Sequence, residues 1–451
     1  MQSTRRSKTF AAGLTCAALM IFSADPMLAA PSASWTACLQ PDRADGSAAC
    51  APRAAASNKL RYEQTAARRS KRAPKAAQRP QATPQAKAKG PPPRAEFTQA
   101  QQAAAVIPGI PDARFWADSE EPYRRVLGQL NGPWLALSAG GEDSAFGAGL
   151  LTGLSETGRR PNYSVVTGVS SGALLAPFAF LGSDRDPDLK RDFTAISAAD
   201  VFEDRRTVDS LLDTWPLREF IAKRITPQLL VDIAAEHRRG RRLIVVTTDL
   251  DSGRPLAWNM GAIAAAGGDA ALKLFREILV ATSAIPGLFP PVPIEVEANG
   301  RRFSELHADG GLAATIYIAP DSTLLATSSP RLPASQVTLI LNSKLMTEFA
   351  MTDRNLVGVL GRSLSIGVKR ASRSAAILIA AAARRSGTDF NVAYVDQGFD
   401  FPSRGLFDPE YMKKLFEAGR QQGRSDEPFR HAMPEATPPQ AAAPQRQPTA
   451  D

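Results

Sequence analysis

The stretch Ser164–Leu175, with the sequence SVVTGVSSGALL, decides the fold. Its opening residues are apolar or β-branched and predict a buried strand, while the residues from Gly172 onward predict a helix. The turn between them is Gly168–Gly172, whose flanks need small residues because a Cβ there would collide with the neighbouring strand or helix. Such a turn exposes the central Ser170 hydroxyl at the sheet edge, near the positive end of the helix dipole. We therefore predict an α/β unit in which Ser170 is a candidate nucleophile.

Strands and helices alternate on both sides of this stretch. The expected strands are short apolar runs, at residues 134–137, 164–167, 242–248, 337–341 and, more weakly, 392–395. The expected helices lie at residues 145–155, 172–181, 211–239 (interrupted at its prolines), 270–282, 356–385 and 409–419. This alternation predicts a mostly parallel sheet covered by helices on both faces. Because no Pro- or Gly-rich linker divides residues 106–423, we expect one α/β domain there.

A glycine-rich loop follows the first expected strand. It has the sequence SAGGEDSAFGAG over residues 138–149. Acyl transfer builds negative charge on a carbonyl oxygen, and backbone N–H groups of a glycine turn at a helix start can stabilise that charge. The alternative is a plain strand-to-helix connection with glycines for close packing. A dinucleotide site fits less well, because the G-x-G-x-x-G pattern is absent.

Asp309 lies in a third motif, HADGG over residues 307–311. A carboxylate has an ordinary pKa near 3.9 and is a poor base unless it is partly desolvated and set against a specific hydroxyl. Gly310 and Gly311 let the backbone approach another group closely. The alternative is an Asp-Gly turn that caps a hairpin.

The three histidines decide between two catalytic arrangements. A Ser–Asp–His triad of the α/β-hydrolase type needs a histidine after the acid, and only His431 follows Asp309, at the start of a Pro- and Ala-rich tail. His237 lies at a charged helix end, where a structural role is expected. His307 would share a strand face with Asp309 and either assist it or pack as a hydrogen-bonded core residue. A dyad of Ser170 and Asp309 explains these positions best, with a triad through His431 as the alternative.

In this order, the three motifs resemble those of the patatin-like acyl hydrolases. The resemblance rests on residues 139–149, on Gly168–Gly172 and on Asp309–Gly311, with the sequence ATSAIPGLFPP at 281–291 ahead of the last. It extends from about Arg114 to about Gly419. It implies a three-layer α/β/α sandwich with a mostly parallel central sheet.

The resemblance also implies the chemistry of the site. Ser170 would be the nucleophile, Asp309 the general base, and the backbone N–H groups of Gly140 and Gly141 the oxyanion hole. Members of the family cleave ester bonds of phospholipids, lysophospholipids or other acyl lipids without a metal or cofactor. We therefore expect a lipid acyl hydrolase, with Leu174, Leu175 and residues 286–289 as candidates to line an acyl pocket, although core packing is the default for each.

The glycine loop departs from the family pattern. The family usually has three consecutive glycines, any residue, a basic residue and a further glycine, whereas residues 139–144 of this chain are AGGEDS. Ala139 and Ser144 each add a Cβ, which disfavours positive φ. Asp143 stands where the basic residue would help to hold an anion. This departure motivates an alternative function, a non-catalytic envelope- or membrane-binding protein on a degraded hydrolase scaffold.

Basic charge is concentrated in the first 95 residues. They carry 16 basic and four acidic side chains, a net charge of +12, whereas the whole chain carries +9. The rest of the chain is therefore slightly acidic, which argues against nucleic acid as a partner of the folded part. Three cysteines and three histidines without CxxC or HExxH give no sign of a metal site or a redox pair.

Residues 1–30 have the pattern of a secretory signal peptide. Three basic residues precede an apolar run from Phe10 to Phe22, and small residues follow it. The run is about 13 residues long, short of the roughly 20 that span a bilayer as a helix, and an uncleaved anchor is the alternative. We expect an exported protein in the periplasm, the cell envelope or the medium.

Two segments are expected to be disordered, a basic Ala- and Pro-rich linker at residues 31–105 and a tail at residues 424–451. Their composition offers too little apolar surface to offset the entropy of ordering. The linker is a solvated spacer or an electrostatic tether to an anionic membrane or envelope surface. Cys38 and Cys50 within it either pair in an oxidising compartment or lie unpaired in disordered chain.

Overall fold

The structure is a computed structural model, and it describes residues 93–327 and 332–434. Its centre is a sheet of nine strands, seven of which follow one path in the order β1-β5-β4-β3-β2-β8-β9. Along that path they are β1 (Arg114–Trp116), β5 (Arg254–Asn259), β4 (Arg242–Asp249), β3 (Val165–Val169), β2 (Pro133–Leu137), β8 (Gln336–Leu341) and β9 (Asp389–Tyr394). The strands from β4 to β9 along this path run parallel, whereas β5 runs antiparallel to both of its neighbours, β4 and β1. The remaining strands, β6 (Val292–Ala298) and β7 (Arg301–Asp309), form a hairpin that joins the sheet at β4.

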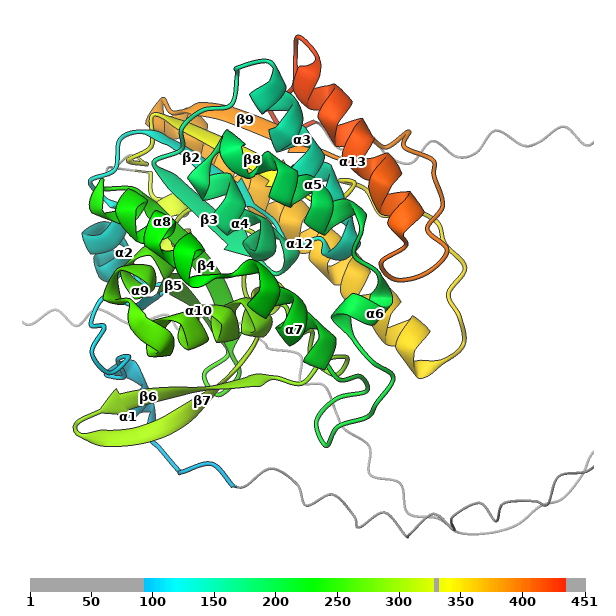
Figure 1. The fold of residues 1–451 in the computed structure, drawn as a ribbon. Coiled ribbons are helices and arrows are strands. Elements are labelled where there is room, and N and C mark those ends of the chain that lie inside the picture. Colours follow the sequence, from blue (N-terminus) through cyan, green and yellow to red (C-terminus); the bar gives the residue numbers. More distant parts are fainter. Residues whose placement is uncertain (1–92, 328–331, 435–451) are drawn as a thin grey trace, which may run out of the picture. The chain divides into compact units, whose positions relative to one another are not determined.

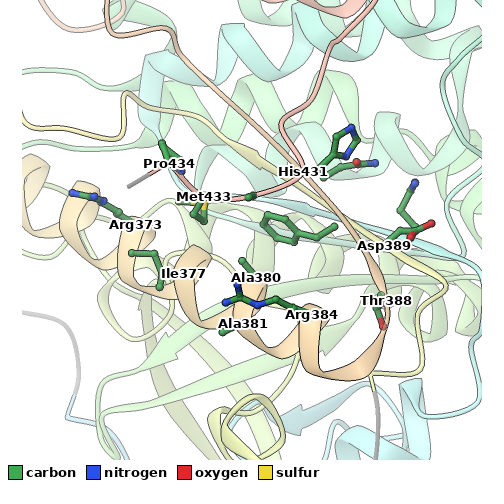
Figure 2. A pocket seen from close by; sticks show the side chains of 14 residues that line it. Arg373, Ile377, Ala380, Ala381, Arg384, Thr388, Asp389, His431, Met433 and Pro434 are labelled. Atoms are coloured by element: carbon green, nitrogen blue, oxygen red, sulfur yellow. The ribbon is translucent and has the colours of Figure 1, made fainter. Parts of the chain in front are cut away.

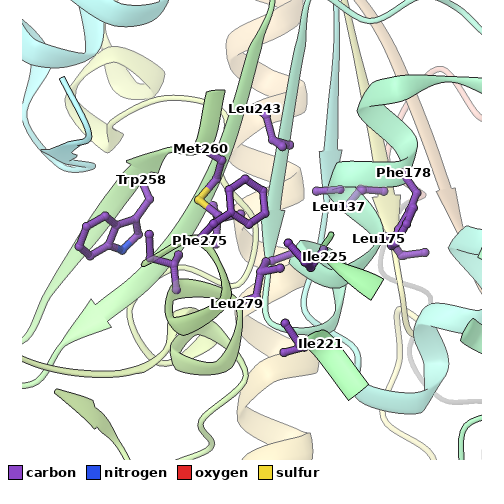
Figure 3. Close-up of a cluster of buried hydrophobic side chains, with 14 of the residues drawn as sticks. Leu137, Leu175, Phe178, Ile221, Ile225, Leu243, Trp258, Met260, Phe275 and Leu279 are labelled. Carbon is purple, nitrogen blue, oxygen red and sulfur yellow. The ribbon is translucent and has the colours of Figure 1, made fainter. Parts of the chain in front are cut away.

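Helices cover both faces of the sheet (Figure 1). Side chains of β2 alternate between two apolar clusters, with Leu135 and Leu137 in one and Trp134 and Ala136 in the other. The first cluster, part of which is drawn in Figure 3, packs the sheet against seven long helices. These are α3 (Ser144–Glu156), α4 (Ser171–Leu181), α5 (Asp186–Thr194), α7 (Trp215–Arg224), α8 (Pro227–Arg238), α10 (Gly268–Thr282) and α13 (Pro409–Arg424).

The second cluster packs the opposite face of the sheet against α2 (Glu120–Leu127) and the second half of α12 (Leu356–Ser386). The predicted three-layer α/β/α sandwich is therefore confirmed. The shorter helices are α1 (Gln99–Ala103), α6 (Ala198–Val201), α9 (Met260–Ala266), α11 (Asp321–Leu325) and the 3-10 helices η1 (Gly141–Asp143), η2 (Ser183–Arg185) and η3 (Gly310–Leu312). Within the described ranges, no helix combines the length and the apolar character needed to cross a bilayer.

The packed region extends beyond both expected boundaries of the domain. Residues 93–105 do not belong to a disordered linker: Phe97 stacks on Phe303, and Val106 bridges to Glu297. At the other end, Arg430 exchanges two backbone hydrogen bonds with Val392 of β9, so residues 424–434 are not a disordered tail. The sequence-based boundaries were too narrow because both segments pack through only a few apolar or backbone contacts. The expected signal peptide, the linker up to residue 92, its two cysteines and the tail after residue 434 lie outside the described residues.

Candidate active site

Ser170 occupies the turn between β3 and α4. Its backbone has φ 54° and ψ −130°, a conformation that non-glycine residues rarely adopt and that is costly to maintain. Both flanking positions require glycine, because neighbouring backbone atoms leave no room for a Cβ. A Cβ on Gly168 would lie 2.6 Å from Ala173 Cα, and one on Gly172 would lie 2.5 Å from Ser138 O. The surrounding structure thus holds the Ser170 hydroxyl at a sharp, strained bend.

Asp309 ends β7 and meets Ser170 because two strands share one edge of β4. β3 pairs with β4 up to Val169 opposite Val246, and β7 pairs with the next residues of β4, with Asp309 opposite Thr247. β7 therefore pairs with the same edge of β4 as β3 does, beyond the point where β3 ends, and it runs antiparallel to β4. The Ser170 hydroxyl donates a hydrogen bond to Asp309 Oδ2 over 2.6 Å. Two side chains 139 positions apart in the sequence are in direct contact.

The surroundings of Asp309 favour its uncharged form. Its side chain is buried, and burial raises the pKa of the carboxyl to about 6. The hydrogen bonds from Ser170 and from the Gly311 N–H act in the opposite direction but do not cancel this effect. A carboxylate with a pKa close to neutrality is a better proton acceptor than one with an ordinary pKa.

The glycine loop contacts both of these motifs. Ser144 Oγ and Ser171 Oγ lie 2.6 Å apart, and a Cβ on Gly311 would lie 3.4 Å from Ala139 Cβ. Gly310 also leaves no room for a side chain, because a Cβ there would lie 2.2 Å from Val246 O. The three motifs that the sequence separates therefore converge at the carboxyl end of β3.

Gly140 and Gly141 begin the turn that leads into α3. A Cβ on Gly140 would lie 2.2 Å from the backbone oxygen of Asn342, so only glycine fits there. Gly141 has φ 58°, which favours glycine. Neither departure from the family pattern strains the loop: Ser144 has φ −66°, and Ala139 is not among the residues with positive φ. The expected conflict with positive φ at these two positions was wrong.

Ser170 and Asp309 both lie within the residues that match a known protein family. Residues 135–320 match the family model described as Patatin-like phospholipase. The chain contains a patatin-like phospholipase domain. This match supports lipid acyl hydrolysis as the general class of activity. Among solved structures, VipD from Legionella pneumophila aligns with a TM-score of 0.34 and 12% identity, over 66% of this chain and 67% of that chain. The comparison with curated proteins gave no match.

The acidic residues of the glycine loop bind to the start of α13. Asp143 Oδ1 accepts a hydrogen bond from the Tyr411 hydroxyl over 2.6 Å, and Glu142 Oε2 accepts one from the Asp408 N–H over 3.2 Å. Burial raises the pKa of both carboxyls, that of Glu142 to about 7, where the neighbouring charge of Asp143 adds to the effect. The two side chains thus anchor the loop to the start of α13, and Asp143 is bound there by Tyr411 where the family has a basic residue.

Two further residues position the site, and the sequence analysis assigned them no role. Thr282 Oγ1 accepts a hydrogen bond from the Ser170 N–H over 2.9 Å and donates to Val246 O. Asn342 donates from its side chain to Ser138 O, and its N–H donates to Ser138 Oγ, both over 2.9 Å. A signal existed for Asn342, a polar residue directly after a strongly apolar strand. Thr282 looks like an ordinary helix end in the sequence.

The histidines take no part in the Ser170–Asp309 contact. His431 lines a cavity of about 770 Å³ together with Gln336, Asp389 and Arg373 (Figure 2). Gln336 and Asp389 begin β8 and β9, so His431 lies at the amino edge of the sheet, whereas Ser170 lies at the carboxyl edge. The alternative of a triad through His431 is therefore wrong.

The other two histidines pack against neighbouring elements. His237 packs against α9, where a Cβ on Gly261 would lie 2.5 Å from its Nδ1, and burial lowers its pKa to about 4. His307 is fully buried, with its Nδ1 3.1 Å from Thr247 Oγ1. Both therefore have structural surroundings, which the sequence analysis expected for His237 and gave as one of two alternatives for His307.

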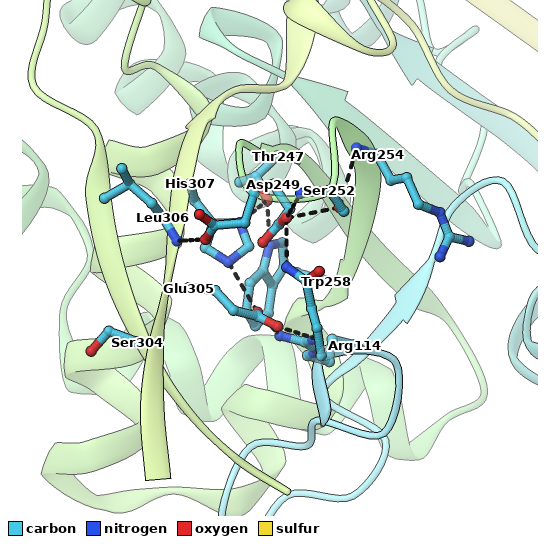
Figure 4. Close-up of polar contacts among 12 residues, drawn as sticks. Arg114, Thr247, Asp249, Ser252, Arg254, Trp258, Ser304, Glu305, Leu306 and His307 are labelled. Carbon is cyan, nitrogen blue, oxygen red and sulfur yellow. Dashed lines mark hydrogen bonds and ion pairs between the residues drawn. The ribbon is translucent and has the colours of Figure 1, made fainter. Parts of the chain in front are cut away.

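A buried ionic network surrounds Glu305 and His307, which lie four and two residues before Asp309 on β7 (Figure 4). Asp249, Glu305 and His307 offer ligand atoms within 4.8 Å of one another, which is compatible with metal ligation. Both oxygens of Glu305, however, already accept hydrogen bonds from the buried Arg114 guanidinium. A cation here would face that guanidinium at close range, so we assign the network to holding β7 against β4 and β1.

The expected acyl-pocket residues divide into two groups. Leu175, Leu288 and Phe289 are buried in the core. Leu174, Pro286 and Gly287 are partly or fully exposed beside the site. Core packing thus accounts for the first group, and only the second remains available to a substrate.

Proposed function

We propose that this chain is an exported serine lipid acyl hydrolase, a phospholipase A or lysophospholipase-like esterase with a Ser170–Asp309 dyad. The observation that carries the proposal is the 2.6 Å hydrogen bond from Ser170 Oγ to a buried carboxylate with a raised pKa. A direct contact of this kind lets the carboxylate take the hydroxyl proton without an intervening histidine.

In the proposed reaction, Ser170 Oγ forms a bond to the ester carbonyl carbon while its proton moves to Asp309 Oδ2. The N–H groups of Gly140 and Gly141 stabilise the negative charge on the carbonyl oxygen. The ester C–O bond then breaks, and the proton on Asp309 passes to the leaving alkoxide. Asp309 next takes a proton from water, whose oxygen attacks the acyl-serine, and Ser170 is regenerated as the carboxylic acid leaves.

Export and surface attachment belong to the same proposal. Export rests on the basic and apolar pattern of residues 1–30, and attachment on residues 31–95, whose 13 basic and three acidic side chains give a net charge of +10 that fits an anionic membrane or envelope surface. Fractionation of cells and determination of the mature N-terminus test both. Recovery of a full-length chain from the cytoplasm would remove export from the proposal.

The catalytic part is tested by hydrolysis of phospholipids, lysophospholipids and neutral esters by the purified protein. Ser170→Ala should reduce hydrolysis of every accepted lipid to background while the circular dichroism spectrum is retained. The lipid class that is cleaved fastest identifies the substrate. Absence of turnover on all three classes by a folded wild-type protein would favour the alternative, a non-catalytic binding protein on a hydrolase scaffold.

A further inference from the structure

Helix α12 is longer than the sheet that it covers. It has 31 residues and is about 46 Å long at 1.5 Å per residue. Its buried residues, Ser372, Ala376, Ile379, Ala382 and Ala383, all lie in the second half of the helix. No residue from 356 to 371 is buried. The first half of α12 therefore projects past the sheet.

The projecting half lies at the edge of the sheet that holds the candidate active site. α12 connects the carboxyl end of β8 to the amino end of β9, so it begins at the carboxyl edge (Figure 1). Leu360 packs against Gly287, where a Cβ would lie 3.3 Å from Leu360 Cδ2. Gly287 is three residues after Ala284, whose backbone oxygen accepts the Asp309 N–H. A short run of contacts thus links the start of α12 to the site.

Large apolar side chains are exposed at this start. Phe349 is 92% exposed and Met351 is 87% exposed, in the segment that leads into the helix. Leu356, Val357 and Val359 follow at 64%, 40% and 50%. We call these five residues the 349–359 patch. Exposed apolar residues scattered singly are ordinary, but five within eleven positions mark an interaction surface.

The charge beside the patch is positive. The first half of α12 carries three basic residues, Arg362, Lys369 and Arg370, and no acidic one, and Arg354 precedes the helix. The acidic residues near its start are Asp353 and Glu348, and Glu348 is paired with Lys344 and Lys369. Apolar anchors combined with basic side chains are typical of surfaces that bind anionic lipid headgroups while inserting into the acyl region.

We propose that the 349–359 patch and the basic first half of α12 dock this protein on an anionic lipid surface, with the Ser170 edge of the sheet facing the lipid. The purpose of the docking rests on the proposed function, since lipid substrates reside in aggregates, but the docking itself does not. The experiments therefore use the full chain with Ser170→Ala, which leaves the lipids intact.

Sedimentation with vesicles tests the docking. The double change Phe349→Ser and Met351→Ser should weaken binding to vesicles of phosphatidylcholine and phosphatidylglycerol about tenfold or more. The control is Leu325→Ser, which should bind as the parent does. Leu325 is 61% exposed and follows Leu324, whose backbone oxygen accepts a hydrogen bond from Arg385 near the opposite end of α12. Equal binding by the double variant, an equal loss in the control, or equal binding to pure phosphatidylcholine would each overturn the proposal.

Fluorescence separates docking by the patch from binding by the basic N-terminal segment. The parent chain already holds five tryptophans, so its emission is the reference. Relative to that reference, Phe349→Trp should add a blue-shifted emission with anionic vesicles, quenched by brominated acyl chains, whereas Leu325→Trp should add none. Vesicle binding without quenching at position 349 would overturn the proposal. In the catalytically intact chain, the Phe349→Ser and Met351→Ser variant should keep hydrolysis of a water-soluble ester and lose hydrolysis of vesicle phospholipid. Equal loss on both substrates would also contradict docking.

Discussion

Strand β7 carries two buried carboxylates with opposite acid–base properties. Asp309 faces only uncharged donors, the Ser170 hydroxyl and the Gly311 N–H, and burial raises its pKa to about 6. Glu305 is also buried, but contacts with His307 and Arg114 outweigh burial and lower its pKa. The same strand thus holds one carboxylate as an ion-pair partner and another as a potential base. The neighbours of each group, rather than burial alone, determine the difference.

Of the changes to these two carboxylates, the one at Asp309 should have the largest effect, and that effect is on catalysis. Asp309→Asn removes the proton acceptor but keeps the shape and one acceptor oxygen, so kcat/KM should fall roughly 10³-fold. Thermal stability should be unchanged or higher, because no buried charge needs to be accommodated. Ester kinetics and a thermal melt check both. Activity within a factor of ten of wild type would remove Asp309 from the mechanism.

The next effect is on stability, at the other carboxylate. Glu305→Gln leaves the Arg114 guanidinium buried without its counter-ion, which should cost about 3–5 kcal/mol of unfolding free energy. The control is Glu297→Gln, which breaks the exposed pair with Arg302 and should cost less than about 1 kcal/mol. Urea denaturation measures both. Similar losses in the two variants would show that the buried network does not hold β7.

The pH dependence of activity tests the difference in pKa between Asp309 and Glu305. The active form of Asp309 is the carboxylate, and its pKa is raised, so kcat/KM should fall as the pH drops below about 6 and should be flat above it. The lowered pKa of Glu305 keeps that group ionised in the same range. Circular dichroism at each pH should therefore show a folded protein while activity is lost. Activity that persists unchanged at pH 4.5 would contradict the assignment of the base.

The smallest effect is expected in the glycine loop. Ala139→Gly restores a family residue, but the φ of Ala139 is not positive and its side chain packs near Gly311. Activity should therefore change by less than about threefold. A large gain would show that the Cβ of Ala139 limits the loop.

Much of the fold was predictable because the parallel strands are continuous apolar runs. β2, β3, β4, β8 and β9 each appeared in the sequence within a few residues of their bounds. β5 and β6 were missed because they alternate with polar residues or begin with Arg and Pro. β7 was anticipated only as the strand face that His307 and Asp309 share, and the pairing of β5 and β7 depends on β4.

The residues of the site were predictable from the sequence, but the geometry that brings them together was not. Ser170 and Asp309 stand out through their glycine-flanked motifs, but their contact depends on β7 continuing the edge of β4. The local sequence does not determine this register of β7 on β4. For the same reason, Thr282 and Asn342 became visible only through hydrogen bonds to distant backbone groups.

Covalent labelling by a fluorophosphonate tests the central claim most directly, because it needs an activated serine but no knowledge of the lipid. Intact-mass and peptide analysis should show one adduct, on Ser170, and Asp309→Asn should slow labelling by roughly 100-fold or more. No adduct, an adduct on another residue, or an unchanged rate in Asp309→Asn would contradict the account.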